Sequence, residues 1–392
     1  MKSTKKPPRL IHLTTTDISL ALLLGPQLRA FQEAGYEVIG MSATGPYARE
    51  LESWGIRHYS LGNATRSMAP HRDLLALAEL VRAFRSLRPD IVHTHNPKPG
   101  IYGRLAARIA RVPVVVNTVH GLYAVPEDRL AKRAVVYSLE RIAAGCSNAE
   151  LLQNEEDVSV LRKIGVPADR IKVLGNGIDL ARFDSSKVDA SKAALIRKQI
   201  GATDQQVVCG VVGRLVLEKG LREIFGAARL LTKSSPNVVF AIVGPADPEK
   251  ADAITPDEIA MAEAIGNVKF LGMRDDIEAV YAACDLYALA SHREGFPRSA
   301  MEASAMGLAV VATNIRGCRQ VVADNVTGRL VQLGDVEALA SAIAQLANDS
   351  ELRTKMGLAA RAKATSEFDQ QRIIDTTLAT YARLIAADSD DG

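Results

Sequence analysis

Short apolar runs alternate with amphipathic stretches along the first half of the chain. The apolar runs predict strands at residues 9–13, 38–41, 56–60, 91–93, 114–119 and 171–174. The stretches between them carry apolar residues at helical spacing and predict helices over residues 20–34, 46–54, 71–87 and 100–110. Strands that alternate with helices of this length are typical of parallel βαβ units. The pattern therefore predicts a doubly wound parallel sheet.

The second half repeats the alternation. It predicts strands at 207–212, 239–243, 268–271, 286–289 and 309–312, and helices at 257–264, 276–283, 336–346, 350–364 and 369–385. At 392 residues the chain is too long for one ordinary core, so two domains are expected. The phrase GNGID (Gly175 to Asp179) opens a stretch without periodicity, where we place the linker, near residues 176–192. We divide the chain into residues 1–176, residues 177–368, and a last segment, 369–392, that ends in an acidic tail expected to be disordered.

Composition excludes several classes of protein. With 47% apolar and 24% charged residues the chain resembles a soluble globular protein, and no run approaches the roughly 18 apolar residues of a membrane span. The four cysteines are scattered without a CxxC pair, which favours buried free thiols in a reducing cytosol. The basic residues 1–9 are not followed by an unbroken apolar stretch, so we expect no export signal and a cytoplasmic protein. A net charge of only +3 and few aromatic residues disfavour a nucleic-acid binder.

Charge is unevenly distributed. Residues 1–190 hold 26 Lys and Arg against 19 Asp and Glu, whereas the remainder is net acidic. Two predicted helices carry clusters of basic residues: Arg72, Arg82, Arg85 and Arg88 on one, and Arg129, Lys132, Arg133 and Arg141 on the other. A basic amphipathic helix is typical of peripheral contact with an anionic membrane surface. A surface helix whose apolar stripe lies in the core gives the same pattern, and both alternatives stay open.

Two carboxylates bracket the segment EGFPRSAME, from Glu294 to Glu302. The strand before it and the helical spacing after it place Glu294 on a loop at the carboxyl end of the strand and Glu302 one turn into the helix. Pro297 suits the first helical position, where its missing N–H costs nothing. Ligands bind in this crevice of open α/β sheets, and a helix N-terminus favours phosphate. A sugar nucleotide would offer its phosphates to the helix and its hydroxyls to the two carboxylates. The alternative is that Glu294 is a solvated loop residue and Glu302 a first-turn residue stabilised by the helix dipole.

A second segment, GRLVLEKG (Gly213 to Gly220), follows the first predicted strand of the second half. Gly213 lets the chain turn, while Arg214 and Lys219 place two cations at a strand-to-helix junction. A planar guanidinium and a compact ammonium suit the two phosphates of a nucleoside diphosphate. The segment is not a P-loop, because the GxxxxGK[ST] order is absent, and the first loop of the chain carries no GxGxxG.

E-x7-E with an internal GFP resembles the signature of the retaining family-4 glycosyltransferases (glycosyltransferase group 1). The resemblance implies the α/β GT-B fold: two doubly wound Rossmann-like domains that face a central cleft, with a last helix that crosses back to the first domain. It implies an N-terminal acceptor-binding domain and a C-terminal domain that binds the nucleotide sugar. The implied donor-binding residues are Gly213, Arg214, Lys219, Met273, Arg274, Glu294, Gly295, Phe296, Pro297, Arg298 and Glu302.

The first half contributes three further candidates. In the resembled family a histidine at the end of the strand 114–119 contacts the transferred sugar, and this role falls to His120; a hydrogen-bonded strand-end histidine is the alternative. His93 and His95 are expected to point to opposite faces of their strand, so that only one, His95, faces the acceptor, and no further zinc ligand is evident nearby. Asp17 is a second candidate for an acceptor hydroxyl, although a helix N-cap is the competing interpretation.

The resemblance implies a transferase of EC class 2.4, hexosyl or N-acetylhexosaminyl. Its catalytic residues would be His120, Arg214, Lys219 and Glu294, with the cations stabilising the departing diphosphate so that neither metal nor cofactor is required. The expected partners are a UDP-sugar and a lipid-linked saccharide of surface-polysaccharide assembly. The alternatives are a small soluble acceptor, a UDP-sugar epimerase on the same architecture, and a hinge-type sugar-binding protein, which the absence of an export signal disfavours.

Overall fold

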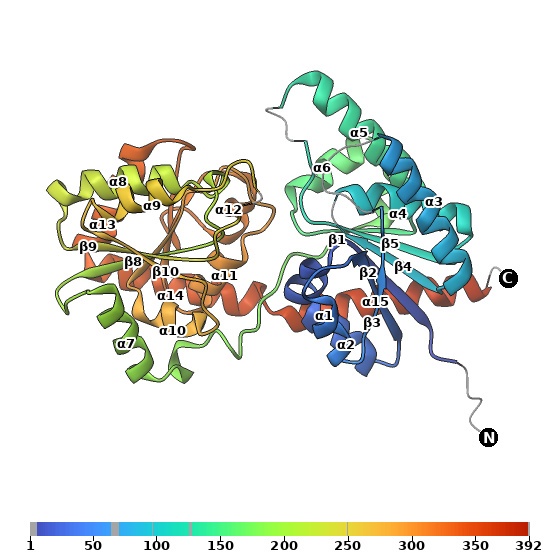
Figure 1. Ribbon diagram of the computed structural model, residues 1–392, viewed down its shortest axis with the longest axis horizontal. Helices are drawn as coiled ribbons and strands as arrows, with labels where there is room; N and C mark the ends of the chain where they lie inside the picture. The colour runs from blue at the N-terminus through green and yellow to red at the C-terminus, as the bar shows by residue number, and fades with distance from the viewer. Residues whose placement is uncertain (1–5, 64–69, 96, 125–127, 249, 391–392) are drawn as a thin grey trace. The chain divides into compact units, whose positions relative to one another are not determined.

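The protein forms two compact units in a computed structural model that describes residues 6–63, 70–95, 97–124, 128–248 and 250–390 (Figure 1). The first unit comprises the chain up to Gly175 together with the segment from Gln371 onward, and the second comprises Asn176–Gln370. The expected boundaries, 176 and 368, differ from these by one or two residues.

The first unit is a seven-stranded parallel sheet between two helical layers. Its strands are β1 (Arg9–Thr16), β2 (Glu37–Ala43), β3 (Arg57–Ser60), β4 (Ile91–His95), β5 (Val114–Val119), β6 (Ala149–Leu152) and β7 (Ile171–Val173). Its helical elements are the π-helix η1 (Ser19–Leu23), α1 (Gly25–Glu33), α2 (Ala48–Ser53), α3 (Pro70–Leu87), α4 (Pro97–Ala110), α5 (Leu130–Ala144), α6 (Glu156–Lys163), the 3-10 turn η2 (Ala168–Arg170) and α15 (Gln370–Asp390).

The strand order of this sheet is β3-β2-β1-β4-β5-β6-β7. One face packs on η1, α1, α2 and α15 through a core that includes Leu10, Phe31 and Tyr381. The other face packs on α3 and α4 through a core that includes Leu13 and Phe84. The order reverses between β1 and β4, and such a switch point opens a crevice at the carboxyl ends of the two strands.

The second unit is a six-stranded parallel sheet, also covered on both faces. Its strands are β8 (Val207–Val212), β9 (Val238–Val243), β10 (Val268–Gly272), β11 (Leu286–Leu289), β12 (Ala309–Thr313) and β13 (Gly328–Val331). Its helical elements are η3 (Ser185–Lys187), α7 (Ala190–Ile200), η4 (Leu217–Lys219), α8 (Leu221–Ser234), α9 (Pro256–Glu263), α10 (Ile277–Ala283), α11 (Arg298–Ala305), α12 (Arg316–Val321), α13 (Val336–Asn348) and α14 (Ser350–Glu367). The strand order β10-β9-β8-β11-β12-β13 places its switch point between β8 and β11.

Three local predictions were wrong. The expected helix over 20–34 is divided at Leu24 into the π-helix η1 and the helix α1, which has Pro26 in its first turn. The expected linker near 176–192 ends early, because Asp189 caps α7 by accepting a hydrogen bond from the Ser191 backbone N–H. The acidic tail, expected to be disordered, is helical as far as Asp390, where α15 ends. Residues 391–392 lie outside the described part of the chain.

Candidate active site

The switch point of the second unit carries both sequence motifs. Gly213 follows β8, and the turn η4 then leads to Gly220 and α8. Gly220 has a positive φ of 72°, and a Cβ there would lie 1.9 Å from the carbonyl oxygen of Ala290, just after β11. Glycine is thus required for the loop after β8 to pack against the loop after β11. This close approach brings Lys219 to Glu294.

Lys219 and Glu294 form an ion pair at the centre of this crevice. The Lys219 ammonium lies 2.6 Å from Oε1 of Glu294, and Ser291 donates a hydrogen bond of 2.7 Å to the same oxygen. The side chains of the pair are largely buried, at 23% and 11% exposure. An ammonium has three hydrogen-bond donors and a carboxylate has several acceptor sites, so the pair can offer both donors and acceptors to a ligand.

Arg214 lies on the same loop and forms an ion pair that is more exposed to solvent. Its Nη1 contacts Asp247 at 2.7 Å, and its side chain is 42% exposed. Ion pairs at such exposure contribute only about 0–1 kcal/mol. The guanidinium can therefore exchange Asp247 for an anionic ligand at small cost.

Glu302 lies on α11 among tyrosine hydroxyls. Tyr281 donates a hydrogen bond of 2.9 Å to Oε2 of Glu302, and Tyr287 donates one of 2.7 Å to Ser299. Burial raises the pKa of Glu302, and the nearby charge of Arg298 opposes that rise. The carboxyl group is positioned by its neighbours and half-buried at the start of the helix.

The other expected donor-site residues occupy different environments. Met273 is 61% exposed after β10, whereas the guanidinium of Arg274 forms two hydrogen bonds of 2.8 Å to Asp276. Phe296 packs edge-on against Phe368, with ring centroids 5.8 Å apart.

The turn that leads into α11 also differs slightly from expectation. Pro297 immediately precedes α11, whose first residue is Arg298, and so stands one position before the expected one. Gly295 lies against Gly317 of α12, where a Cβ would clash with the carbonyl oxygens of Glu294 and Gly295.

In the first unit, four histidines form one chain of contacts. His95 Nδ1 lies 3.1 Å from His120 Nε2, and His95 Nε2 lies 2.9 Å from His12 Nδ1. His12 Nε2 is 3.4 Å from the Tyr381 hydroxyl, which also bonds His93 Nδ1. The expectation that His93 and His95 face opposite sides was wrong: residues two apart in a strand share a face, and their rings stack 4.2 Å apart.

His95 is linked to a neighbouring histidine through each of its ring nitrogens. A neutral imidazole donates through one nitrogen and accepts through the other, so the His12–His95 and His95–His120 hydrogen bonds run in the same direction along the chain. Burial lowers the pKa of His12 to about 3 and of His120 to about 4, so these imidazoles are neutral at neutral pH.

His12, His93 and His95 also form a group that could hold a metal ion. Their ligand atoms lie within 4.8 Å of one another, which corrects the expectation that no further ligand lies near His93 and His95. The ring nitrogens already have hydrogen-bond partners, among them Thr118 for Nε2 of His93 at 2.7 Å. The cluster is satisfied as a hydrogen-bonded network, and we assign no ion to it.

Both residues expected to bind the acceptor have their polar atoms occupied within the protein. Asp17 is buried, and its Oδ2 accepts hydrogen bonds from the backbone N–H groups of Tyr47 and Ala48 at the start of α2. It therefore holds α2 rather than capping the helix that follows it. His95 is 1% exposed and lies between His12 and His120.

Sequence reasoning missed the residues that hold the predicted ones in place. Ser291, Asp247 and Tyr281 contact Glu294, Arg214 and Glu302 respectively. No local pattern marks Asp247 or Tyr281, because the strand order brings them to the crevice. Ser291 could have been found, since it lies three residues before Glu294 in the same loop.

None of the helices among the described residues is sufficiently long and apolar to cross a bilayer. Residues 193–363 match the family of glycosyl transferases group 1, and residues 27–182 match glycosyltransferase family 4. The chain is 29% identical to the UDP-Gal:alpha-D-GlcNAc-diphosphoundecaprenol alpha-1,3-galactosyltransferase of Escherichia coli over 98% of this chain and 99% of that protein. It is 28% identical to the capsular polysaccharide biosynthesis glycosyltransferase CapM of Staphylococcus aureus, over 96% and 97% of the two chains.

Solved structures agree on the fold. The crystal structure of Anabaena Alr3699/HepE in complex with UDP and glucose matches with a TM-score of 0.79 at 23% identity, over 96% of this chain and all of that one. The lipopolysaccharide glycosyltransferase WaaG matches with a TM-score of 0.73 at 19% identity, over 94% and 98% of the two chains. The chain is a glycosyltransferase that uses a nucleotide sugar, and it belongs to family 4 (glycosyltransferase group 1) with the GT-B fold.

Proposed function

We propose that the chain is a retaining glycosyltransferase that moves a sugar from a UDP-sugar to a hydroxyl group of a lipid-linked saccharide. The observation that carries the proposal is the Lys219–Glu294 pair at the β8–β11 switch point, with Arg214 on the same loop. The activity for which the E. coli relative is named supplies the donor and acceptor classes, a UDP-sugar and a sugar on diphosphoundecaprenol. The reaction would belong to the assembly of a surface polysaccharide, as the name of the S. aureus relative indicates for that protein.

In the proposed reaction Lys219 and Arg214 bind the diphosphate of the donor. They stabilise the negative charge that develops as the bond from the sugar to the diphosphate breaks. Glu294 accepts hydrogen bonds from hydroxyls of the donor sugar, and Glu302 from the ribose. The acceptor hydroxyl attacks on the face that the leaving group vacates, with retention of configuration, and its proton passes to the departing diphosphate. Because protein cations carry the leaving-group charge, no metal ion is required.

The role of Lys219 is tested by Lys219→Ala against the matched control Lys233→Ala, an exposed lysine near the end of α8. Loss of a charge-stabilising donor typically lowers kcat about 10²–10³-fold. We expect that loss for Lys219→Ala and for Arg214→Ala. The rates of the Lys233→Ala control, and of the wild type in EDTA, should be unaltered. Near-normal turnover in both site variants would refute the diphosphate role, and a strict metal requirement would refute the metal-independent mechanism.

We also propose that α5 makes peripheral contact with the inner face of the plasma membrane. Its apolar residues Leu130, Val135 and Ile142 are 78%, 59% and 59% exposed, so they do not form a stripe in the core. Arg129 and Arg141 are exposed on the same helix and its N-cap. An apolar surface flanked by cations is what an anionic bilayer surface attracts.

Sedimentation with anionic vesicles at low salt tests the membrane contact. The wild type should pellet in part, and Val135→Asp should pellet several-fold less, because a carboxylate then enters the interface. Leu358→Asp is the matched control, as Leu358 is 65% exposed on α14 of the other unit. A wild type that stays entirely in the supernatant would remove the argument for α5.

A further inference from the structure

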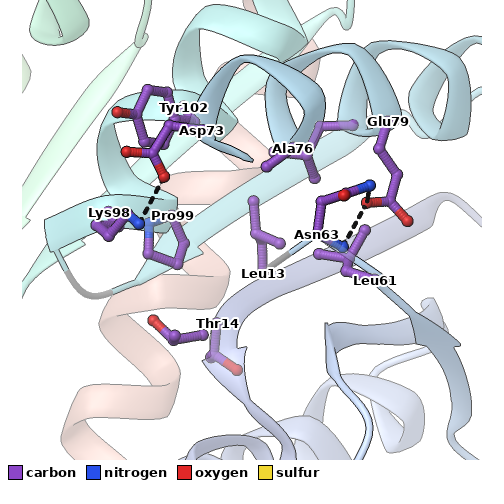
Figure 2. A pocket seen from close by; sticks show the side chains of 12 residues that line it. Leu13, Thr14, Leu61, Asn63, Asp73, Ala76, Glu79, Lys98, Pro99 and Tyr102 are labelled. Atoms are coloured by element: carbon purple, nitrogen blue, oxygen red, sulfur yellow. Dashed lines mark hydrogen bonds and ion pairs between the residues drawn. The ribbon is translucent and has the colours of Figure 1, made fainter. Parts of the chain in front are cut away.

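A pocket lies at the carboxyl end of β1, one of the two switch-point strands of the first unit, between α3 and α4 (Figure 2). Thr14 and Thr15 at the end of β1 and Lys98 in the first turn of α4 lie at its edge, and α3 forms the opposite wall. Gly103 allows α4 to approach the sheet, because a Cβ there would lie 2.5 Å from Leu13. The pocket is therefore built by the same kind of crevice that forms the donor site in the second unit.

The inner wall of the pocket is apolar. Leu13, Leu61, Ala76, Leu80 and Pro99 contribute it from the sheet, the segment after β3, and helices α3 and α4. A ligand group that enters this space gains by burying hydrocarbon and has few hydrogen bonds to make there.

Polar groups lie at the rim and bond one another. Lys98 and Asp73 form an ion pair of 2.6 Å with side chains 16% and 6% exposed, and Tyr102 bonds Asp73. On the other side Glu79 accepts from the backbone N–H of Asn63 at 3.0 Å and from its side-chain amide at 3.0 Å (Figure 2).

Charge and volume restrict the occupant. The three charged groups of the lining, Asp73, Glu79 and Lys98, sum to a single negative charge, which disfavours a phosphate. The cavity volume is ≈ 40 Å³, and a water molecule needs about 10–15 Å³ on this scale. The pocket thus accommodates a neutral group of about three heavy atoms, with a hydrogen-bond donor and an acceptor beside it at the Lys98–Asp73 pair.

We propose that this pocket binds the N-acyl group of an N-acetylated amino sugar at the end of the acceptor. The methyl group lies against Ala76 and Leu80, the amide carbonyl accepts from Lys98, and the amide N–H donates to Asp73. The proposal rests on the proposed function, since it names the class of acceptor sugar. It also replaces Asp17 and His95, whose polar atoms are engaged inside the protein, as the place where the acceptor binds.

Binding of two acceptors measured by calorimetry tests the subsite independently of turnover. The probes are N-acetylglucosamine and glucose, each linked through diphosphate to an identical undecyl chain, so that they differ only in acetamido against hydroxyl. A site that buries such a group discriminates by roughly 10–200-fold. We expect the wild type to bind the N-acetylated probe at least ~10-fold more tightly.

Two alanines on α3 provide matched variants. Ala76→Leu fills the pocket and should abolish the preference for the N-acetylated probe. Ala78→Leu adds the same volume to the same helix outside the lining and should retain the preference. Ala76→Val is the milder replacement if the leucine variant does not fold.

Equal affinity of the wild type for the two probes would overturn the proposal. An equal loss of both affinities in Ala76→Leu, absent from Ala78→Leu, would also overturn it. A retained preference without sugar transfer from any UDP-sugar would count against the proposed function and leave the N-acyl subsite standing. Sugar transfer without a preference between the two probes would support the proposed function and overturn the N-acyl subsite.

Discussion

Acidification should selectively destabilise the first unit through its buried histidines. His12 is fully buried, and burial lowers its pKa from 6.5 to about 3. Between these two values the unfolded chain binds a proton that the folded chain does not, so stability falls as pH falls. The contribution of His12 is complete above pH ~6.5 and declines on acidification toward its folded-state pKa.

The magnitude follows from the two pKa values. Between pH 7 and pH 5 the unfolded imidazole becomes almost fully protonated while the folded one stays neutral. The free energy of unfolding contributed by His12 then drops by about 2 kcal/mol, since each pH unit is worth about 1.4 kcal/mol. His93, His95 and His120 also have lowered pKa values from burial and act in the same direction.

The variant His12→Asn isolates this contribution. Asparagine keeps a polar group near the position of Nδ1 and cannot titrate, so the stability of the variant should fall by about 2 kcal/mol less than that of the wild type between pH 7 and pH 5. The single tryptophan of the chain, Trp54, lies in the first unit, so its fluorescence during urea unfolding reports that unit alone. His71→Asn, at an exposed histidine of α3, is the control. Equal pH dependence in His12→Asn and the wild type would show that His12 is not buried as a neutral imidazole.

Two further predictions concern packing. Gly220→Ala should destabilise the second unit and remove most turnover, because the added Cβ would clash with the Ala290 carbonyl. The control is Gly201→Ala, where φ is 77° and the surroundings are open; it should cost only about 1–2 kcal/mol and leave turnover intact. Equal effects would show that the close approach is not required. Arg104→Met should cost about 3–5 kcal/mol by Trp54 fluorescence, because it leaves the carboxylates of Glu140 and Glu150 buried without their cation; a loss under 1 kcal/mol would contradict this.

Most of the fold was predictable because its strands are continuous apolar runs. A parallel strand buried on both faces has this pattern whatever its partners, as Val114–Val119 and Val207–Val212 illustrate. The strands Ala149–Leu152 and Gly328–Val331 were missed, since Glu150 and Arg329 interrupt their apolar runs. The helix Ala190–Ile200 was missed because it follows an irregular stretch and carries many polar residues.

The candidate site of the second unit was predictable to the extent that its residues are local in sequence. Glu294 and Glu302 share one loop and helix, so their spacing alone indicates their placement. The pairing of Lys219 with Glu294 depends instead on β8 lying beside β11, which only the sheet order establishes. The same applies to His12, which reaches His95 because β1 pairs with β4.

The return of α15 to the first unit has a consequence for how the protein is made. The second unit is continuous in sequence, whereas the first is closed by residues that are synthesised after the whole of the second. Tyr381 completes the core against Phe31 and bonds His93, so the first unit cannot finish folding until the second unit and α15 have both left the ribosome. Residues 176–370 are accordingly the segment suited to separate expression, and truncation before α15 should harm the half that precedes it in the sequence.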